Sequence, residues 1–325
     1  MTIIILSKNK FISVILLILF FSKINIDLEK KLNESHFCDK CIYDKKLKKS
    51  CSKCSINLIY KPIKIKSIEE TIDEIIKNKK SISRFGDGEF SIIFNENIRF
   101  QKFNKNLKYK LLEVLNSKIK DLMIGIMNFE DLKIKPFWKE WFKRNKFRFL
   151  KLLNKDTIYY NSFISRFVTL FKNPTKNKYY ISKIKSIWNN RNILIIEGEK
   201  TRMGIGNDLF NNTKSIKRII CPTINAFKAY YRILRYFKKN NIDRETLILI
   251  ALGPTATVLS YELCKKGFQS LDLGHLDIQY EYFLKNVTHE IKISNKYVNE
   301  VSGGSLNISP VKDKNYYKQI LVKFT

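Results

Sequence analysis

Two carboxylates, Asp87 and Glu89, lie one residue apart between glycines in the stretch Ser83–Phe90, which follows a short apolar alternation. The alternation predicts an extended strand, in which residues i and i+2 project to the same face. On such a strand both carboxylates would point at one spot. Carboxylate oxygens are the ligands that hard divalent cations prefer, so the pair predicts a site for Mn²⁺ or Mg²⁺.

The neighbours of this pair suit an anionic ligand. Gly86 and Gly88 carry no side chains, which would let a diphosphate approach the backbone closely. Arg84 would lean toward the same face and could bind a phosphate through both of its terminal nitrogens. Taken alone, Asp-x-Glu between glycines is also compatible with a plain polar turn.

A second stretch predicts an anion site at a helix start. An apolar run from Leu247 is followed by Gly253-Pro254-Thr255 and then by a helical period. This pattern is typical of a buried parallel strand that leads into a helix, whose first amides are free to bind a phosphate or a ribose.

Two further stretches end at what should be the same edge of the sheet. Ser270–Asp277 alternates like the end of a strand and delivers His275 and Asp277 there. The segment 197–208 is a glycine-rich polar loop directly after an apolar strand, although a solvated connection would look similar. Its candidate residues are Glu197, Glu199, Lys200, Arg202, Asn207 and Asp208.

The elements that must position these residues form an α/β pattern. Helical spacing of apolar residues predicts helices over 67–79, 104–119 and 226–237, while apolar runs predict strands over 121–128, 192–196 and 215–221. Strands that alternate with helices favour a Rossmann-like, open and mostly parallel sheet flanked by helices.

Six of these motifs, in this order, resemble the GT-D-fold glycosyltransferases. They extend over most of the chain, roughly from Ile65 to Leu284. The motifs are Arg84–Phe90, Asn161–Arg166, Glu197–Arg202, Gly206–Phe210, Leu252–Ala256 and Asp272–Asp277.

The resemblance implies a metal-dependent transferase that moves a hexose from a UDP-sugar to a glycan or glycoprotein acceptor. By that resemblance Asp87 and Glu89 take the metal and nucleotide. The segment Phe167–Phe171 lacks the proline and acidic character associated with the family after Arg166, so the acceptor stays open.

Roles for the other polar residues follow from this hypothesis. His275 is expected as a third metal ligand or a phosphate contact, with a structural histidine as the alternative. If the reaction inverts, Asp277, Glu199 or Asp208 is the expected general base. The expected nucleotide-sugar contacts are Arg84, Gly86, Gly88, Lys200, Arg202, Asn207, Asp208, Gly253, Pro254 and Thr255.

The first 25 residues resemble a signal anchor or signal peptide. The apolar run Phe11–Phe21 follows Lys8 and Lys10, and no small-x-small cleavage site comes after it. The run is shorter than the ~20 residues of a full span. We expect an uncleaved anchor that binds the membrane, with the catalytic domain, residues 63–325, on the lumenal or exported side. A buried terminal element is the alternative.

Residues 26–62 form a basic segment with two Cys-x-x-Cys pairs. Such pairs are compatible with a zinc site or with two disulfides, and an exported location favours disulfides. We expect a stem without catalytic residues. The four cysteines are Cys38, Cys41, Cys51 and Cys54.

The formal charge of +31 comes from 61 basic and 30 acidic residues among 325. The basic residues are mainly lysines that are spread along the whole chain rather than clustered with aromatic residues, so we expect no nucleic-acid partner. Two alternatives to the transferase remain from the sequence. One is a non-catalytic nucleotide-sugar or glycan-binding protein, and the other is a basic zinc-knuckle protein that binds nucleic acid.

Overall fold

The computed structural model describes residues 63–128, 136–171 and 173–324. The chain divides into two compact units, residues 1–62 with Asn145–Lys155, and Ile63–Arg144 with Asp156–Thr325. The expected anchor and the four stem cysteines lie outside the described residues. Within the described ranges, no helix has the length and apolar character needed to cross a bilayer.

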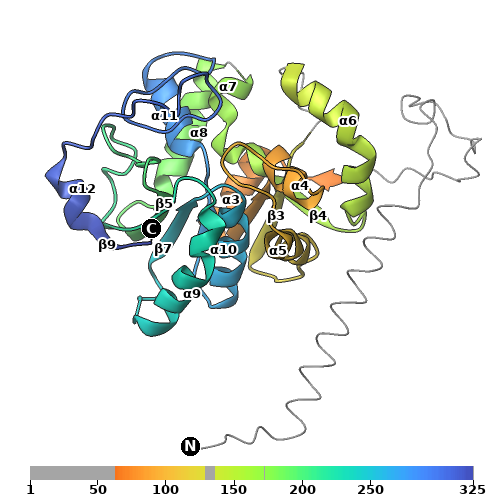
Figure 1. The fold of residues 1–325 in the computed structure, drawn as a ribbon, viewed down its shortest axis with the longest axis horizontal. Coiled ribbons are helices and arrows are strands. Elements are labelled where there is room, and N and C mark those ends of the chain that lie inside the picture. Colours follow the sequence, from red (N-terminus) through yellow and green to blue (C-terminus); the bar gives the residue numbers. More distant parts are fainter. Residues whose placement is uncertain (1–62, 129–135, 172, 325) are drawn as a thin grey trace, which may run out of the picture. The chain divides into compact units, whose positions relative to one another are not determined.

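The larger unit contains a sheet of nine strands, all of them parallel to their neighbours (Figure 1). This confirms the predicted α/β fold with an open, parallel sheet. In spatial order the strands are β1 (Lys64–Ile65), β4 (Ile158–Asn161), β3 (Leu122–Ile126), β2 (Ser81–Phe85), β8 (Ser270–Asp272), β7 (Leu247–Ala251), β5 (Asn192–Gly198), β6 (Ser215–Cys221) and β9 (Ile320–Lys323).

The central strands are apolar along their length because both faces of the sheet are covered. All five residues of β7 are buried, as are all five of β3. A parallel strand with helices on both faces needs such a continuous run rather than an alternation. The core therefore lies in the middle of the sheet, directly beneath its polar carboxyl edge.

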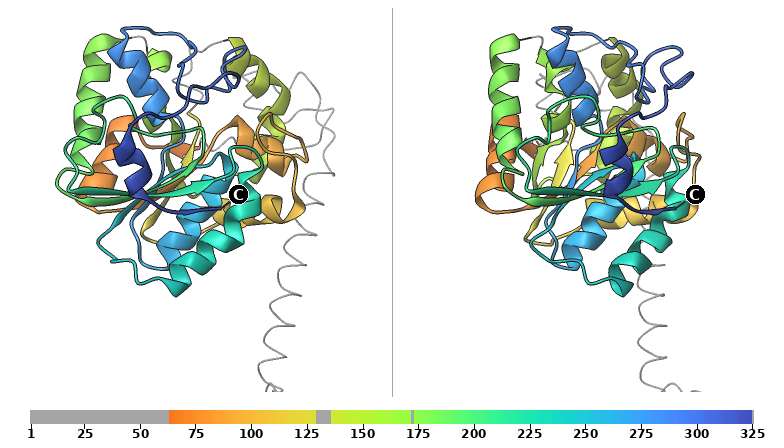
Figure 2. Two further views of the ribbon diagram at one scale, coloured as in Figure 1. Left: turned by 60° about the vertical axis from the view of Figure 1, so that its left-hand side comes forward. Right: turned by 90° about the vertical axis from the view of Figure 1, so that its left-hand side faces the viewer.

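Helices pack on the two faces of this sheet (Figures 1 and 2). The helices α5 (Lys105–Leu115), α9 (Tyr230–Lys239) and α10 (Pro254–Lys265) lie together on one face, and α3 (Ile68–Lys77) and α8 (Pro174–Ser186) lie on the other. The remaining helices are α4 (Asp87–Ile93), α6 (Pro136–Leu152), η1 (Ser162–Ser165), α7 (Phe167–Phe171), η2 (Ala226–Ala229), α11 (Leu276–Leu284) and α12 (Lys314–Gln319).

The chain leaves β2 and β8, which are neighbours in the sheet, toward opposite faces. Helix α4 follows β2 and packs against α5, whereas α11 follows β8 and packs against α7 and α8. Ligands of open α/β sheets bind outside the carboxyl ends of the strands at such a point. Residues 285–313, which contain no helix or strand, run over this same edge before α12 (Figure 2).

Candidate active site

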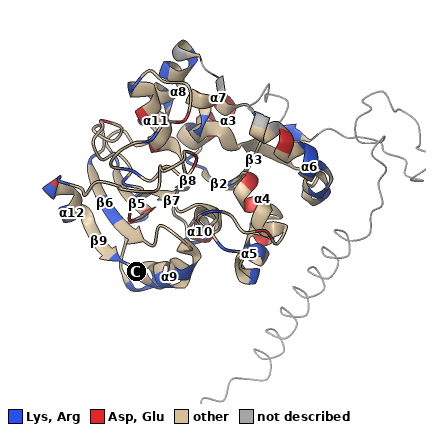
Figure 3. Ribbon diagram, turned by 45° about the horizontal axis from the view of Figure 1, so that its top comes forward, with Lys and Arg blue, Asp and Glu red and all other residues tan. Residues whose placement is uncertain are grey.

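Asp87 and Glu89 lie in the first turn of α4 and not on a strand (Figure 3). Strand β2 ends at Phe85, and Gly86 is the N-cap of the helix. The Glu89 Oε2 atom accepts a hydrogen bond from the Gly86 amide at 2.7 Å. The predicted strand was wrong here because acidic residues in a first turn satisfy free amides and favour the helix dipole, which outweighs the alternation before them.

Both carboxyls are held in a poorly solvated place. Burial raises the pKa of Glu89 to about 7, and the nearby Asp272 charge adds to the rise. Burial also raises the pKa of Asp87, against the opposing effect of the Arg166 guanidinium. The helix start therefore presents two carboxyls whose charged forms gain from a cation.

Arg84 is engaged in structural contacts rather than exposed to a phosphate. Its Nη2 donates to Asp272 Oδ1 at 3.0 Å, and its Nη1 donates to the Ser162 carbonyl at 2.9 Å. Its side chain is only 11% exposed. A Cβ at Gly274, where φ is +43°, would lie 2.3 Å from Arg84 Nη2. The side chain thus joins β2, β8 and η1, and the expected phosphate contact stays a prediction.

His275 faces an arginine and an amide instead of the two carboxylates. Its ring nitrogens lie 3.0 and 3.2 Å from Arg166 Nη2, and its Nε2 lies 3.2 Å from Asn299 Oδ1. Burial, followed by the Arg166 charge, lowers its pKa to about 4. Arg166 also forms an ion pair with Glu300. The structural alternative for His275 therefore fits its contacts better than a metal ligand.

Arg166 and Glu300 were not among the predicted site residues. The sequence around Arg166 could have indicated a site residue, because an arginine follows a polar turn at a strand's carboxyl end. No sequence pattern indicates Glu300, since residues 285–313 have no periodicity and reach the site only through the fold.

Asp277 is buried inside a polar network. Its Oδ2 accepts from the fully buried Lys296 Nζ at 2.7 Å, and its Oδ1 accepts from Asn207 Nδ2 at 2.9 Å and from the Gly204 amide at 2.8 Å. Lys296 also contacts Glu281 Oε1 at 2.9 Å. Asp277 and Asn207 hold loops onto α11, and the roles expected for them in the reaction stay predictions.

Asp208 and Arg202 are likewise held by other parts of the loops. Asp208 accepts from the Tyr280 hydroxyl at 2.6 Å and from Lys185 Nζ at 2.9 Å. Arg202 Nη1 donates to the carbonyls of Asn295 and Ser309. These contacts fix the loop after β5, and the nucleotide-sugar contacts expected of both side chains stay predictions.

The amino end of α10 is covered by an aromatic ring. Gly253 has φ +54°, and a Cβ there would lie 2.4 Å from the Phe100 ring. Pro254 and Thr255 are buried, and Thr255 Oγ1 has no hydrogen-bond partner among the described residues. In this arrangement Phe100 lies where the predicted phosphate would approach.

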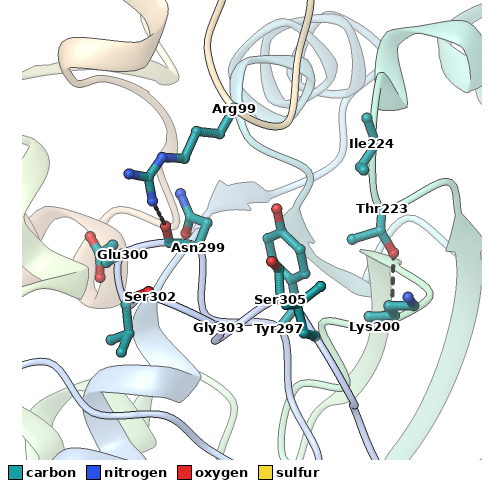
Figure 4. A pocket seen from close by; sticks show the side chains of 12 residues that line it. Arg99, Lys200, Thr223, Ile224, Tyr297, Asn299, Glu300, Ser302, Gly303 and Ser305 are labelled. Carbon is teal, nitrogen blue, oxygen red and sulfur yellow. Dashed lines mark hydrogen bonds between the residues drawn. The ribbon is translucent and has the colours of Figure 1, made fainter.

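A pocket of about 530 Å³ opens beside this edge (Figure 4). Two cationic side chains, Arg99 and Lys200, line it together with the ring of Tyr297. Arg99 Nη1 donates to the Asn299 carbonyl at 2.8 Å, and Thr223 Oγ1 accepts from the Lys200 amide at 3.2 Å. The other lining residues are Ile224, Asn299, Glu300, Val301, Ser302, Gly303, Ser305 and Leu306.

The pocket and the acidic helix start are joined by shared residues. Asn299 and Glu300 line the pocket and also contact His275 and Arg166. Arg166 in turn lies within electrostatic reach of Asp87. Of the predicted residues, the structure thus brings together Asp87, Glu89 and, through the pocket, Lys200.

The residues present fit one mode of divalent-cation binding. In the described part of the chain, no three His, Cys, Asp or Glu side chains gather in a way that could hold a metal ion. Mg²⁺, however, is commonly bound by one or two carboxylates together with substrate phosphates and waters. Asp87 and Glu89, which interact electrostatically, are the carboxylates expected for that mode, and a metal-ligand role of His275 stays a prediction.

Comparison with known families gives one match, which covers most of the sheet and the site. Residues 82–301 match the family described as "Glycosyltransferase GT-D fold". This range includes β2 through β8 and the residues that line the pocket up to Val301. It also includes both Arg166 and Glu300.

Two curated streptococcal proteins are similar to this chain. "Glycosyltransferase GlyD" of Streptococcus pneumoniae is 36% identical over 269 residues, which are 80% of this chain and 32% of the relative. "Probable glycosyl transferase Gly" of Streptococcus gordonii is 34% identical over 246 residues, 73% of this chain and 36% of the relative. The chain thus spans about a third of the length of these relatives.

Solved structures of similar size share the fold. One, described as the highly conserved domain of unknown function 1792 with a distinct glycosyltransferase fold, matches with a TM-score of 0.76 at 33% identity, over 82% of this chain and 97% of its own. Another, described as a new glycosyltransferase from Streptococcus sanguinis, matches with a TM-score of 0.76 at 32% identity, over 81% of this chain and all of its own (100%).

Proposed function

The chain belongs to the GT-D-fold glycosyltransferase family, and from this premise we propose that it transfers a hexose from a UDP-sugar to a glycan or glycoprotein acceptor with the help of Mn²⁺ or Mg²⁺. The observation that carries the proposal is the cationic pocket, joined through Arg166 and Glu300 to the acidic start of α4.

The pocket has the groups that a nucleoside diphosphate needs. Arg99 and Lys200 bring positive charge for the phosphates, and the Tyr297 ring offers a face on which the base can stack. Hydroxyls of Thr223, Ser302 and other residues line the same space and suit the polar edges of base and ribose. A volume of about 530 Å³ is within the range of ligand pockets.

Asp87 and Glu89 would hold the divalent cation beside this pocket. When bound, such a cation neutralises the negative charge that develops on the leaving diphosphate. The carboxyls are suited to this because burial disfavours their charged forms until a cation arrives. Of the three expected general bases, Glu199 and Asp208 are exposed. Asp208 contacts Tyr280 and Lys185, whereas no hydrogen bond or ion pair within the described residues engages the Glu199 carboxylate.

The test is a screen of nucleotide-sugars with the full chain, in Mn²⁺ or in EDTA, that measures release of UDP. We expect metal-dependent release from one UDP-sugar, reduced at least ~100-fold in the double variant Asp87→Ala with Glu89→Ala. Glu245→Ala is the matched control, because Glu245 is exposed, its carboxylate lies 3.4 Å from Lys79 Nζ, and it is not among the residues that line the pocket. Binding of a nucleotide-sugar without turnover in the wild type would instead indicate a non-catalytic binding protein.

A further inference from the structure

The Arg166 guanidinium contacts an indole ring, a carboxylate and an imidazole ring. The residue follows the short helix η1, and its guanidinium lies over the Trp138 ring, 5.8 Å from the centroid. It forms an ion pair with Glu300 and contacts the His275 ring. Its side chain is 19% exposed, so the ion pair is partly shielded from water.

Glu300 provides the negative charge opposite Arg166 on the side of the pocket. Its carboxylate lies 3.7 Å from His275 Nε2 and belongs to a residue that lines the pocket, whereas Arg166 does not line it. Glu300 therefore faces the pocket and, through its ion pair, the Arg166 guanidinium.

A diphosphate in this pocket would meet the Glu300 carboxylate. Like charges at close range repel each other strongly where water is partly excluded. His275 does not offset this repulsion with a positive charge near neutral pH, because its pKa is lowered to about 4. The planar fork of an arginine, in contrast, matches phosphate as well as carboxylate.

We propose, on the basis of the function proposed above, that Arg166 binds the diphosphate of the donor, and that the Glu300 carboxylate occupies this anion site until the diphosphate displaces it. The exchange keeps the Arg166 charge paired in both states. It also releases the pocket-lining segment at Glu300 when donor binds. A carboxylate that competes for the guanidinium weakens diphosphate binding, and its removal should strengthen it.

The test is calorimetric titration of the full chain with inorganic pyrophosphate and with UDP, each in Mn²⁺. We expect Glu300→Gln to lower the dissociation constant of both ligands about tenfold, which corresponds to about 1.4 kcal/mol. Arg166→Gln should raise it at least about tenfold. In the Arg166→Gln background, Glu300→Gln should give no gain, because the two side chains act through one contact.

Controls separate this inference from general charge and from folding. Glu245→Gln changes the net charge equally and should leave both constants unchanged. Arg166→Lys keeps the charge without the planar fork, and its dissociation constants should lie between those of wild type and Arg166→Gln. This variant also replaces Arg166→Gln as the test if Arg166→Gln does not fold. Thermal unfolding of each variant shows whether it is folded.

Two results would overturn the inference: unchanged or weaker pyrophosphate binding in Glu300→Gln, or an equal gain from this change in the absence of Arg166. These are distinct from failure of the proposed function. If no UDP-sugar is turned over but the pyrophosphate pattern holds, the anion site stands without the transferase. If UDP-sugar is turned over and Glu300→Gln binds pyrophosphate no tighter, the transferase stands without this role for Arg166.

Discussion

Glu89 has two separate tasks in the first turn of α4. One of its oxygens accepts the Gly86 amide hydrogen bond that closes the helix start, at 2.7 Å. The proposed second task is to share a divalent cation with Asp87. The first task needs only a hydrogen-bond acceptor, whereas the second needs a negative charge, so substitution can separate them.

Glu89→Gln should therefore lose activity without losing stability. The glutamine oxygen can still accept from the Gly86 amide, but it carries no charge for a cation. We expect UDP release to fall at least ~100-fold, while the free energy of unfolding changes by less than about 0.5 kcal/mol. Glu89→Ala should lose the same activity and about 1 kcal/mol in addition. Urea denaturation and the UDP assay check both, and full activity in Glu89→Gln would contradict the cation role.

Gly274 is required by the position of Arg84. A Cβ at Gly274 would lie 2.3 Å from Arg84 Nη2 and would displace the guanidinium from Asp272. Gly274→Ala should therefore lower the free energy of unfolding by about 3 kcal/mol or more. Gly267→Ala is the matched control, because Gly267 also has positive φ, +81°, but nothing lies within 4 Å of its Cβ position. It should cost only about 1 kcal/mol. Equal losses in urea denaturation would argue against the clash.

At the scale of elements, residues 285–313 are held on the sheet edge by polar contacts instead of regular structure. Lys296 is fully buried and contacts Asp277 and Glu281, and Glu300 contacts Arg166. The segment supplies most of the residues that line the pocket. The contacts that hold this segment on the sheet edge therefore also position the pocket.

Lys296→Met should unfold this arrangement at high cost. The substitution leaves two buried carboxylates, Asp277 and Glu281, without their shared cation, and breaking such a buried pair typically costs about 3–5 kcal/mol. The measurement is urea denaturation together with hydrogen exchange over residues 285–313. Lys292→Met, in the same segment but exposed, should change the free energy of unfolding by less than about 0.5 kcal/mol. A loss as small in Lys296→Met would mean that the network does not hold the segment.

Elements that depend on the local sequence pattern could be predicted, whereas contacts between residues far apart in the sequence could not. The apolar runs at 192–196 and 247–252 correctly predicted β5 and β7, because a strand covered on both faces needs only apolar residues. The start of α4 was missed because the predicted strand, which is β2 as far as Phe85, was continued past Gly86, the N-cap of the helix. Arg84 and Asp272 are 188 residues apart, so no local pattern indicates that they form an ion pair.

The same distinction explains the site. The acidic pair and Lys200 were found because their residue types suggest chemistry without reference to the fold. The buried contact of Asp277 with Lys296 could not be predicted, since Lys296 lies in a segment without periodicity. A carboxylate at a sheet edge can bind a ligand or hold a loop in place, and its role depends on the residues that contact it.

For the whole molecule, the net charge of +31 is the dominant long-range property. Figure 3 shows lysine and arginine on helices and strands in many parts of the fold. Such a field attracts any polyanion, but its effect between exposed charges falls off within about 8 Å at physiological salt. Contacts inside a partly enclosed pocket are screened much less.

Salt should therefore separate unspecific from specific binding. We expect the full chain to retain random duplex DNA at 50 mM NaCl and to lose more than about 100-fold of that affinity by 300 mM. Binding of UDP should weaken by less than about fivefold over the same range. Fluorescence anisotropy of labelled DNA and calorimetry of UDP provide the comparison. A DNA affinity that resists 300 mM salt would revive the nucleic-acid alternative.

The order of strands in the sheet has a consequence for synthesis of the chain. The middle of the sheet pairs β2, near the start of the larger unit, with β8, which ends at Asp272. While the ribosome makes the intervening residues, β2 has one edge without its final partner, and exposed edges of apolar strands readily join other chains. Completion of the core must wait until β8 has emerged. A nascent chain from which β8 has not yet emerged is therefore expected to need a chaperone, whereas one from which β8 has emerged can pair it with β2.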